Sequence, residues 1–123
     1  MTNLTLISVV DDDESVRESL PDLLVALGYE ARAFSSPGEF LRSGVLLKTK
    51  CLILDIAMPG MTGPEFQREL RARRIEIPII FITAHTNGST RSQLIEEGAV
   101  DCLSKPFSEQ ALIDALEAAL RAG

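Results

Sequence analysis

Residues 4–14 read LTLISVVDDDE, an almost continuously apolar run that ends in four acidic residues. Further short apolar runs lie at residues 51–54, 78–82 and 100–103, with a weaker one at residues 29–34. Several of these runs are apolar at nearly every position instead of alternating, which is typical of parallel strands covered on both faces. The chain is therefore predicted to contain a buried parallel sheet.

The segments between these runs have the periodicity of amphipathic helices. Two apolar stripes recur at helical spacing, one formed by Val16, Leu20, Leu23, Leu24 and Leu27 and the other by Leu112, Ala115, Leu116, Ala119 and Leu120. Strands and helices thus alternate, five of each. Such alternation implies right-handed crossovers and a doubly wound α/β sheet.

Helix boundaries are marked by polar residues and glycines. A hydroxyl residue followed three residues later by an acid or amide, the capping-box pattern, occurs at Ser36, Thr62 and Thr90. Gly28 and Gly98 are expected just beyond helix ends, where glycine tolerates a left-handed backbone. Pro21 breaks the local rules, because inside the first helix it removes a backbone hydrogen bond at a cost of about 3 kcal/mol.

The composition fits one compact domain over residues 1–123, with 46% hydrophobic and 24% charged residues. A formal net charge of −6 argues against direct binding of nucleic acid, which depends on lysine and arginine displacing counterions. No stretch approaches the roughly 18 apolar residues of a membrane span, and the first residues do not form a signal peptide. We expect a cytoplasmic protein without membrane contact.

The two cysteines, Cys51 and Cys102, both lie in apolar runs. We expect them to be buried, reduced thiols. The strands that carry them are predicted to be separated by another strand, about 10 Å across the sheet, which is too far for a disulfide.

Polar side chains occur where the predicted strands end. Asp11 and Asp12 follow the first strand, Asp55 ends the third, Thr83 ends the fourth and Lys105 follows the fifth. In an open parallel sheet, ligands bind outside the carboxyl ends of the strands. Each residue alone has an ordinary explanation as a cap, turn or surface residue, but their joint placement predicts a site.

Three carboxylates at one edge repel one another, which calls for a divalent cation. Oxygen ligands without histidine or cysteine favour Mg²⁺, which keeps coordination positions for water and phosphate oxygens. Thr83 and Lys105 would stabilise the oxygens of a phosphoryl group in transfer. Asp55 would then be the nucleophile and form an acyl phosphate.

Five motifs in order resemble response-regulator receiver domains over essentially the whole chain, and among these the FixJ type. The motifs are VVDDDE at residues 9–14, LDIAMPGMTG at 54–63, ITAH at 82–85, GA at 98–99 and KPF at 105–107. The resemblance implies a flavodoxin-like, CheY-like (βα)5 fold with strand order 2-1-3-4-5. It also implies a two-component signalling protein that receives its phosphoryl group from a sensor histidine kinase.

The resemblance further assigns roles to individual residues. Asp55 would be the phosphoacceptor, Asp12 a direct Mg²⁺ ligand and Asp11 an acid acting on the ion partly through water. The backbone carbonyl of Ala57 would be a further ligand. Thr83 and Lys105 would contact the phosphoryl oxygens, and the peptide bond between Lys105 and Pro106 would be cis.

By the same resemblance, the domain is no enzyme acting on a separate substrate, since it only gains and loses its own phosphoryl group. Phosphorylation would act on the surface of the fourth helix, fifth strand and fifth helix, which in many relatives forms a homodimer. FixJ-type relatives usually continue into a helix-turn-helix domain, so we expect a transcriptional output from a part of the protein beyond these residues.

Cys102, and the two residues beside the expected path of water, Ala57 and His85, bear on how the domain would switch and lose its phosphoryl group. Cys102 stands where many receivers carry a tyrosine or phenylalanine coupled to the threonine. We therefore expect activation to rely on the fourth helix and the loop after Thr83. His85, the single histidine, and Ala57 flank the expected path of the attacking water, so His85 either takes a catalytic part or modulates water access.

Two other functions fit the same fold. A pseudo-receiver would bind partners without being phosphorylated, but it would typically lack an acid, the threonine or the lysine, and all are present here. A flavodoxin-like FMN carrier would need a phosphate-binding loop after the first strand. Residues 11–13 are aspartates instead and would repel phosphate in the absence of a metal.

Overall fold

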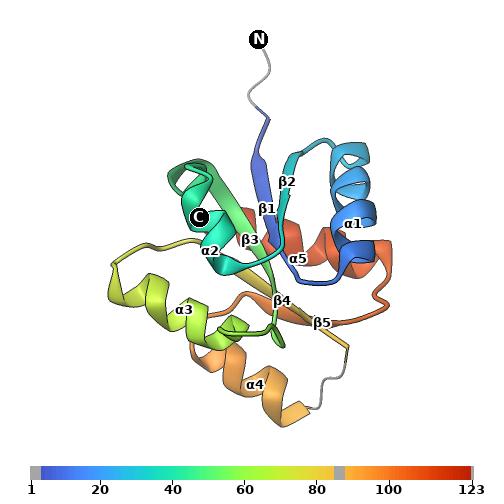
Figure 1. Ribbon diagram of the computed structural model, residues 1–123. Helices are drawn as coiled ribbons and strands as arrows, with labels where there is room; N and C mark the ends of the chain where they lie inside the picture. Colours follow the sequence, from blue (N-terminus) through green and yellow to red (C-terminus); the bar gives the residue numbers. More distant parts are fainter. Residues whose placement is uncertain (1–3, 85–87, 123) are drawn as a thin grey trace.

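A computed structural model describes residues 4–84 and 88–122 (Figure 1). Strands and helices alternate along the part of the chain that it describes. The strands are β1 (Leu6–Val10), β2 (Glu30–Phe34), β3 (Thr49–Asp55), β4 (Ile79–Thr83) and β5 (Asp101–Ser104). The helices are α1 (Glu14–Ala26), α2 (Pro37–Arg42), α3 (Gly63–Ala72), α4 (Gly88–Glu96) and α5 (Glu109–Ala122), with a 3₁₀ turn at Leu46–Lys48.

The five strands are parallel and lie in the order β2-β1-β3-β4-β5. This confirms the predicted fold class and strand order. Every residue of β1 and β4 is buried, which explains why their sequences are apolar at nearly every position. β2 forms one edge and alternates between exposed and partly buried residues until Phe34, which is why its sequence signal is weaker.

Each face of the sheet has its own core, covered by its own helices. Figure 1 shows α1 and α5 on one face, with α2, α3 and α4 on the other. On the first face, Leu24 of α1 and Leu116 of α5 pack against Ile53 of β3. On the second face, Phe40 of α2 and Phe66 of α3 lie edge to face, with ring centroids 6.2 Å apart.

The strand boundaries differ slightly from the prediction. β1 begins at Leu6 instead of residue 4, and β4 begins at Ile79 because Pro78 has no N–H and contributes only its carbonyl, which accepts from Leu52 N at 2.9 Å. Strand β4 ends on Thr83, as predicted, whereas β5 extends one residue further than its predicted run, to Ser104. The polar side chains at these ends therefore still belong to the sheet.

Of the three predicted capping boxes, one is complete. Thr62 Oγ1 accepts from Glu65 N, while the Glu65 carboxylate accepts from Thr62 N. At Ser36 the first bond forms, but the carboxylate of Glu39 binds Ser35 instead. The prediction at Thr90 is wrong, because α4 begins at Gly88 and Thr90 lies inside it. Threonine and glutamine are tolerated within helices, so the pattern alone does not fix a helix start.

Three helices are followed by a glycine with a left-handed backbone, and two of these glycines, Gly28 and Gly98, were predicted. Gly28 and Gly98 have backbone φ angles of 101° and 110°, and Gly44 adopts 81° after α2. After α3 the same left-handed position is taken by Arg74, with φ of 58°. Pro21 lies inside α1, as the sequence indicated.

Across residues 4–84 and 88–122, none of the helices combines the length and the apolar character that crossing a bilayer requires.

Gly63 and Gly88 both begin a helix but differ in their surroundings. A Cβ on Gly63 would lie 2.4 Å from the backbone oxygen of Asp55 and 2.9 Å from the Phe81 ring, whereas a Cβ on Gly88 meets nothing within 4 Å. We expect Gly63→Ala to destabilise the protein by about 1–3 kcal/mol because the end of β3 must move. Gly88→Ala should change stability little. Urea unfolding of both variants checks this, and equal stabilities would contradict it.

Candidate phosphoryl-transfer site

The predicted site residues meet at the carboxyl edge of the sheet. Asp11 directly follows β1, Asp55 is the last residue of β3 and Thr83 the last of β4. Lys105 follows β5. Because neighbouring strands are parallel, these four ends come together, and the backbone N–H of Lys105 donates to the Thr83 carbonyl at 2.7 Å.

Three carboxylates form a compact cluster at this edge. One oxygen from each of Asp11, Asp12 and Asp55 lies within 4.8 Å of the other two. Asp11 and Asp55 are buried, while Asp12 is exposed. At this separation two ionised carboxylates repel by about 3 kcal/mol at an effective dielectric constant near 20. The cluster is therefore unfavourable unless a cation or a proton offsets the charge.

Lys105 supplies part of that positive charge. Its Nζ lies 2.8 Å from Asp11 Oδ2 and 3.7 Å from Asp55 Oδ1. Desolvation by itself would lower the pKa of the ammonium, but the hydrogen bond and charge of Asp11, followed by the charge of Asp55, raise the pKa above its ordinary value. Lys105 is thus held protonated between the two buried acids.

Asp55 has the most strongly shifted titration of the cluster. Burial, the largest cause, and the nearby charge of Asp11 together raise its pKa from 3.8 to about 7, and Lys105 offsets only part of their effect. The carboxyl group therefore carries its negative charge only partly at neutral pH until another cation joins Lys105.

The loop between β1 and α1 is fixed by its own acids. Asp13 N donates to Asp11 Oδ1 at 2.9 Å. Asp13 is the N-cap of α1, and its Oδ1 accepts from Ser15 N at 2.9 Å and from Ser15 Oγ at 2.7 Å. These bonds, the hydroxyl first, lower the pKa of Asp13. Asp13 is therefore a helix-capping acid.

The donor set of this edge fits a hard divalent cation. The cluster presents carboxylate oxygens, two from buried residues and one from the exposed Asp12, and includes no histidine or cysteine. Oxygen ligands of this kind, with an open side toward solvent, suit Mg²⁺. Ala57 lies exposed in the loop that joins β3 to α3.

Sequence comparison identifies the family of this chain. Residues 7–117 match the family described as the response regulator receiver domain. The chain belongs to this family. Receivers of this kind partner with histidine kinases and generally depend on Mg²⁺, and the family comprises signalling domains instead of enzymes acting on separate substrates.

Individual proteins that resemble this chain include response regulators and transcriptional regulatory proteins. Nodulation protein W of Bradyrhizobium diazoefficiens is 46% identical over 114 residues, which cover 93% of this chain and 50% of that protein. Transcriptional regulatory protein FixJ of Azorhizobium caulinodans is 39% identical, covering 93% and 54%. The structure of response regulator StyR superposes with a TM-score of 0.87 at 43% identity, covering 98% and 61%. The chain spans about half the length of the curated relatives it matches.

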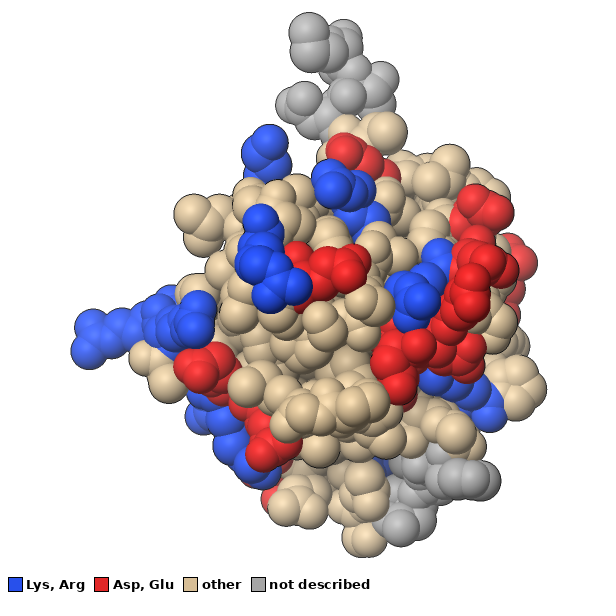
Figure 2. Space-filling view, viewed as in Figure 1, with Lys and Arg blue, Asp and Glu red and all other residues tan. Residues whose placement is uncertain are grey.

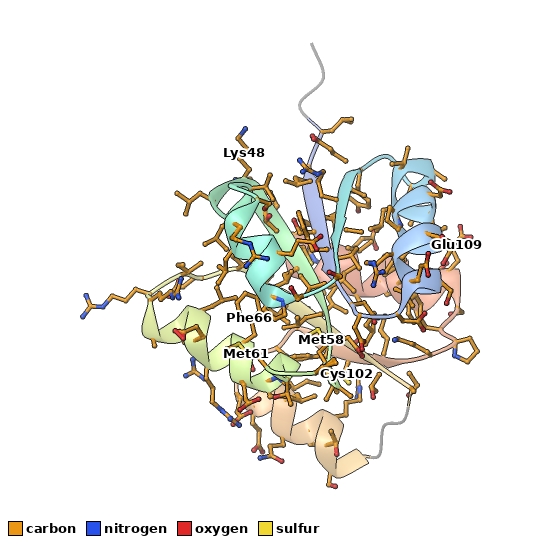
Figure 3. All side chains as sticks on the ribbon, in the orientation of Figure 1. Lys48, Met58, Met61, Phe66, Cys102 and Glu109 are labelled. Carbon is orange, nitrogen blue, oxygen red and sulfur yellow. The ribbon has the colours of Figure 1, made fainter. Side chains whose placement is uncertain are left out.

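The loop that follows Asp55 packs against the second core of the receiver. Met58 is buried and Met61 partly buried, both against the cluster that contains Phe66, and Figure 3 shows the three side chains close together. The two methionines are thus packing residues. The two ends of the loop are joined by a hydrogen bond, in which Gly63 N donates to the carbonyl of Ile56 at 2.9 Å.

Cys102 lies in the core of the receiver, directly opposite Phe81 in the register of β4 and β5. Its side chain is 3% exposed and belongs to the core beneath α3 and α4, whereas Cys51 belongs to the opposite core. Both residues are thiols, and burial raises the pKa of Cys51 to about 12. The prediction of two buried, unbridged cysteines is confirmed.

The peptide bond between Lys105 and Pro106 is cis, as the resemblance implied. His85 lies outside the described residues, so both roles considered for it stay predictions.

Figure 2 shows charged side chains around the site. On the face in view, Asp and Glu gather at the right, over α1, while Lys and Arg extend at the left beyond α3. The exposed acids of α1 are Glu14, Glu18 and Asp22. The site edge thus continues into an acidic helix.

Two residues beside the site were missed from the sequence. Gly63 was assigned to a capping box and to the motif at residues 54–63 without a role of its own, yet its missing side chain lets α3 approach the backbone of Asp55. A glycine directly before Pro64 at a helix start could have signalled close packing. Arg17 donates from Nη1 to the Asp11 carbonyl at 3.0 Å, and a lone arginine on a helix gives no such signal.

The raised pKa of Asp55 predicts a pH-dependent cost to stability. Between pH 3.8 and about 7, the folded protein retains a proton on Asp55 that the unfolded chain has released. The stabilisation that comes from binding this proton is therefore lost as pH rises through 7. In EDTA, Asp55→Asn should raise the free energy of unfolding at pH 8 by about 1–2 kcal/mol, because it removes a buried negative charge. The gain is limited because the substitution also removes a partner of Lys105. The gain should shrink toward pH 5.

Urea unfolding at both pH values measures this effect, with the exposed Asp22→Asn as the matched control. A gain that is equal at pH 5 and pH 8, or one also seen for the control, would contradict the assignment.

Proposed function

We propose that this chain, over residues 1–123, is a phosphorylation-activated receiver in which Asp55 accepts a phosphoryl group from a histidine kinase. The observation that carries the proposal is the carboxylate cluster with Lys105 between its two buried acids. Asp11, Asp12, Asp55 and the carbonyl of Ala57 would hold Mg²⁺. The proposed location is the cytoplasm, as expected from the sequence.

In the proposed reaction, an Asp55 carboxylate oxygen attacks phosphorus as the bond from phosphorus to the donor nitrogen breaks. The products are an acyl phosphate on Asp55 and the histidine of the kinase. When bound, the metal supplies positive charge that keeps Asp55 ionised and neutralises phosphoryl oxygens. In hydrolysis, water attacks phosphorus and releases inorganic phosphate and the Asp55 carboxylate.

Lys105 and Thr83 would stabilise the transferred group. The ammonium of Lys105 lies within 3.7 Å of Asp55 and needs only a short shift from Asp11 to pair with a phosphoryl oxygen. Thr83 is buried at the adjacent strand end, and its backbone is bonded to that of Lys105. The two residues would therefore respond together to the added negative charge.

The proposed output surface consists of α4, β5 and α5. Arg91 of α4 pairs with Asp101 of β5 at 2.8 Å. This ion pair joins α4 to β5, the strand that leads to Lys105. A shift of Lys105 and Thr83 would reach this surface and favour a two-fold homodimer. Since relatives such as TdiR are described as transcriptional regulatory proteins, we propose a transcriptional output for the whole protein, with DNA contacted outside these residues.

Intact mass after incubation with acetyl phosphate tests the acceptor. With Mg²⁺, the wild-type protein and Asp22→Asn should each gain one phosphoryl group, and EDTA or Asp55→Asn should abolish the gain. Phosphorylation of Asp55→Asn at the wild-type level would refute the assignment. If both the small donor and the cognate kinase fail on the wild type, the chain is a pseudo-receiver.

Cys102 should not be required for the switch. Alanine removes the thiol without burying a new hydroxyl, and Cys51→Ala is the matched control from the opposite core. We expect both variants to be phosphorylated and to dimerise within about twofold of wild type, measured by sedimentation velocity. Loss of phosphorylation-dependent assembly in Cys102→Ala alone, with phosphorylation intact, would contradict this view.

A further inference from the structure

Asp11 is held by a hydrogen bond at every polar atom of its backbone and side chain. Its N–H donates to the Phe34 carbonyl at 3.1 Å, and its carbonyl accepts from Arg17 Nη1 at 3.0 Å. Its two carboxylate oxygens accept from Asp13 N and from Lys105 Nζ. The orientation of this residue is therefore fixed from four directions.

The bond from Arg17 differs from the others in what it orients. The Asp11 carbonyl belongs to the peptide group that joins Asp11 to Asp12, so holding this oxygen fixes the plane of that peptide. The plane determines the direction in which the chain leaves Asp11 and hence where Asp12 is placed. β1 has already ended, so no strand supplies a partner for this carbonyl, and Arg17 takes that place.

The position of Arg17 in α1 is otherwise an unfavourable one for a cation. Asp13 caps the helix and α1 begins at Glu14, so Arg17 is the fourth helical residue. Positive charge near a helix N-terminus opposes the helix dipole. Arg17 is nevertheless partly buried there, with its guanidinium on the Asp11 carbonyl.

The charge of Arg17 also acts on one acid of α2. The pKa of Glu39 is lowered, first by its bond with the Ser35 hydroxyl and to a smaller extent by the charges of Arg17 and Arg42. Arg42 shares the charge effect on Glu39, and its guanidinium lies beside Gly38 within α2.

We infer that Arg17 is a positioning residue of the carboxylate cluster, which sets the affinity for the divalent cation by fixing the peptide between Asp11 and Asp12. The inference rests on the Mg²⁺ site of the proposed function. Arg17 touches neither the ion nor the phosphoryl group and acts through Asp12.

Two effects of Arg17 on the cation have opposite signs, which makes the inference testable. As a charge alone, the guanidinium repels a divalent cation, so its removal would tighten binding. As an anchor for the peptide, it orders Asp12 before the ion arrives, so its removal weakens binding. The anchoring effect should dominate, because ordering a released peptide is costly and Arg17 is partly exposed to screening solvent.

Isothermal titration with MgCl₂ at constant ionic strength tests this on the whole chain. Arg17→Met should weaken Mg²⁺ binding by about three- to tenfold. Arg17→Lys, which keeps a charge and a donor, should recover at least part of the affinity. Arg42→Met is the matched control and should stay within about twofold of wild type. Unfolding temperatures in EDTA separate these effects from a general loss of stability.

A double-mutant cycle tests the route through Asp12. In the Asp12→Asn background, Arg17→Met should change Mg²⁺ affinity much less than in the wild type, because the acid it positions is gone. Unchanged or tighter binding by a folded Arg17→Met variant overturns the inference. An equal effect in the Asp12→Asn background also overturns it. If Arg17→Met does not fold, the same criteria apply to Arg17→Ala, which also lacks the donor. A wild-type protein that binds no Mg²⁺ overturns the metal site itself.

Discussion

The rest of the site depends on the repulsion between carboxylates that the fold brings to one place. Asp11 and Asp55 are buried and Asp12 lies beside them, with one oxygen of each within 4.8 Å of the others. This arrangement stores unfavourable energy in the resting protein, offset in part by Lys105 and by the raised pKa of Asp55. A cation, or any change of charge at this edge, therefore alters the electrostatic energy of all the groups around it.

The sheet makes this concentration of charge possible. Its central strands are buried on both faces, so the backbone that carries Asp55 is held by two cores and cannot relax away from its neighbours. Gly63 completes this constraint by letting α3 begin in contact with the Asp55 backbone. The rigid framework thus confines any response to the side chains and loops beyond the strand ends.

Much of the fold could be predicted because burial on two faces leaves a direct trace in the sequence. β1 and β4 were clear from their apolar runs, and β2 was weak because it is a half-exposed edge strand. The acids, threonine and lysine of the site follow from the rule that parallel strands end at one edge. The start of α4 could not be predicted from Thr90, since a local hydroxyl pattern does not identify which turn begins the helix. Arg17 was missed because its partner is a backbone carbonyl, which leaves no pattern in the side-chain sequence.

Each of the two cores contains one cysteine, whose thiol can serve as a natural chemical probe of that core. Cys51 lies in the core beneath α1 and α5, and Cys102 in the core beneath α3 and α4, with the sheet between them. A thiol reagent reaches either sulfur only when the helices over that face open. The relative rates at which the two sulfurs react therefore report local opening of one face independently of the other, without any introduced probe.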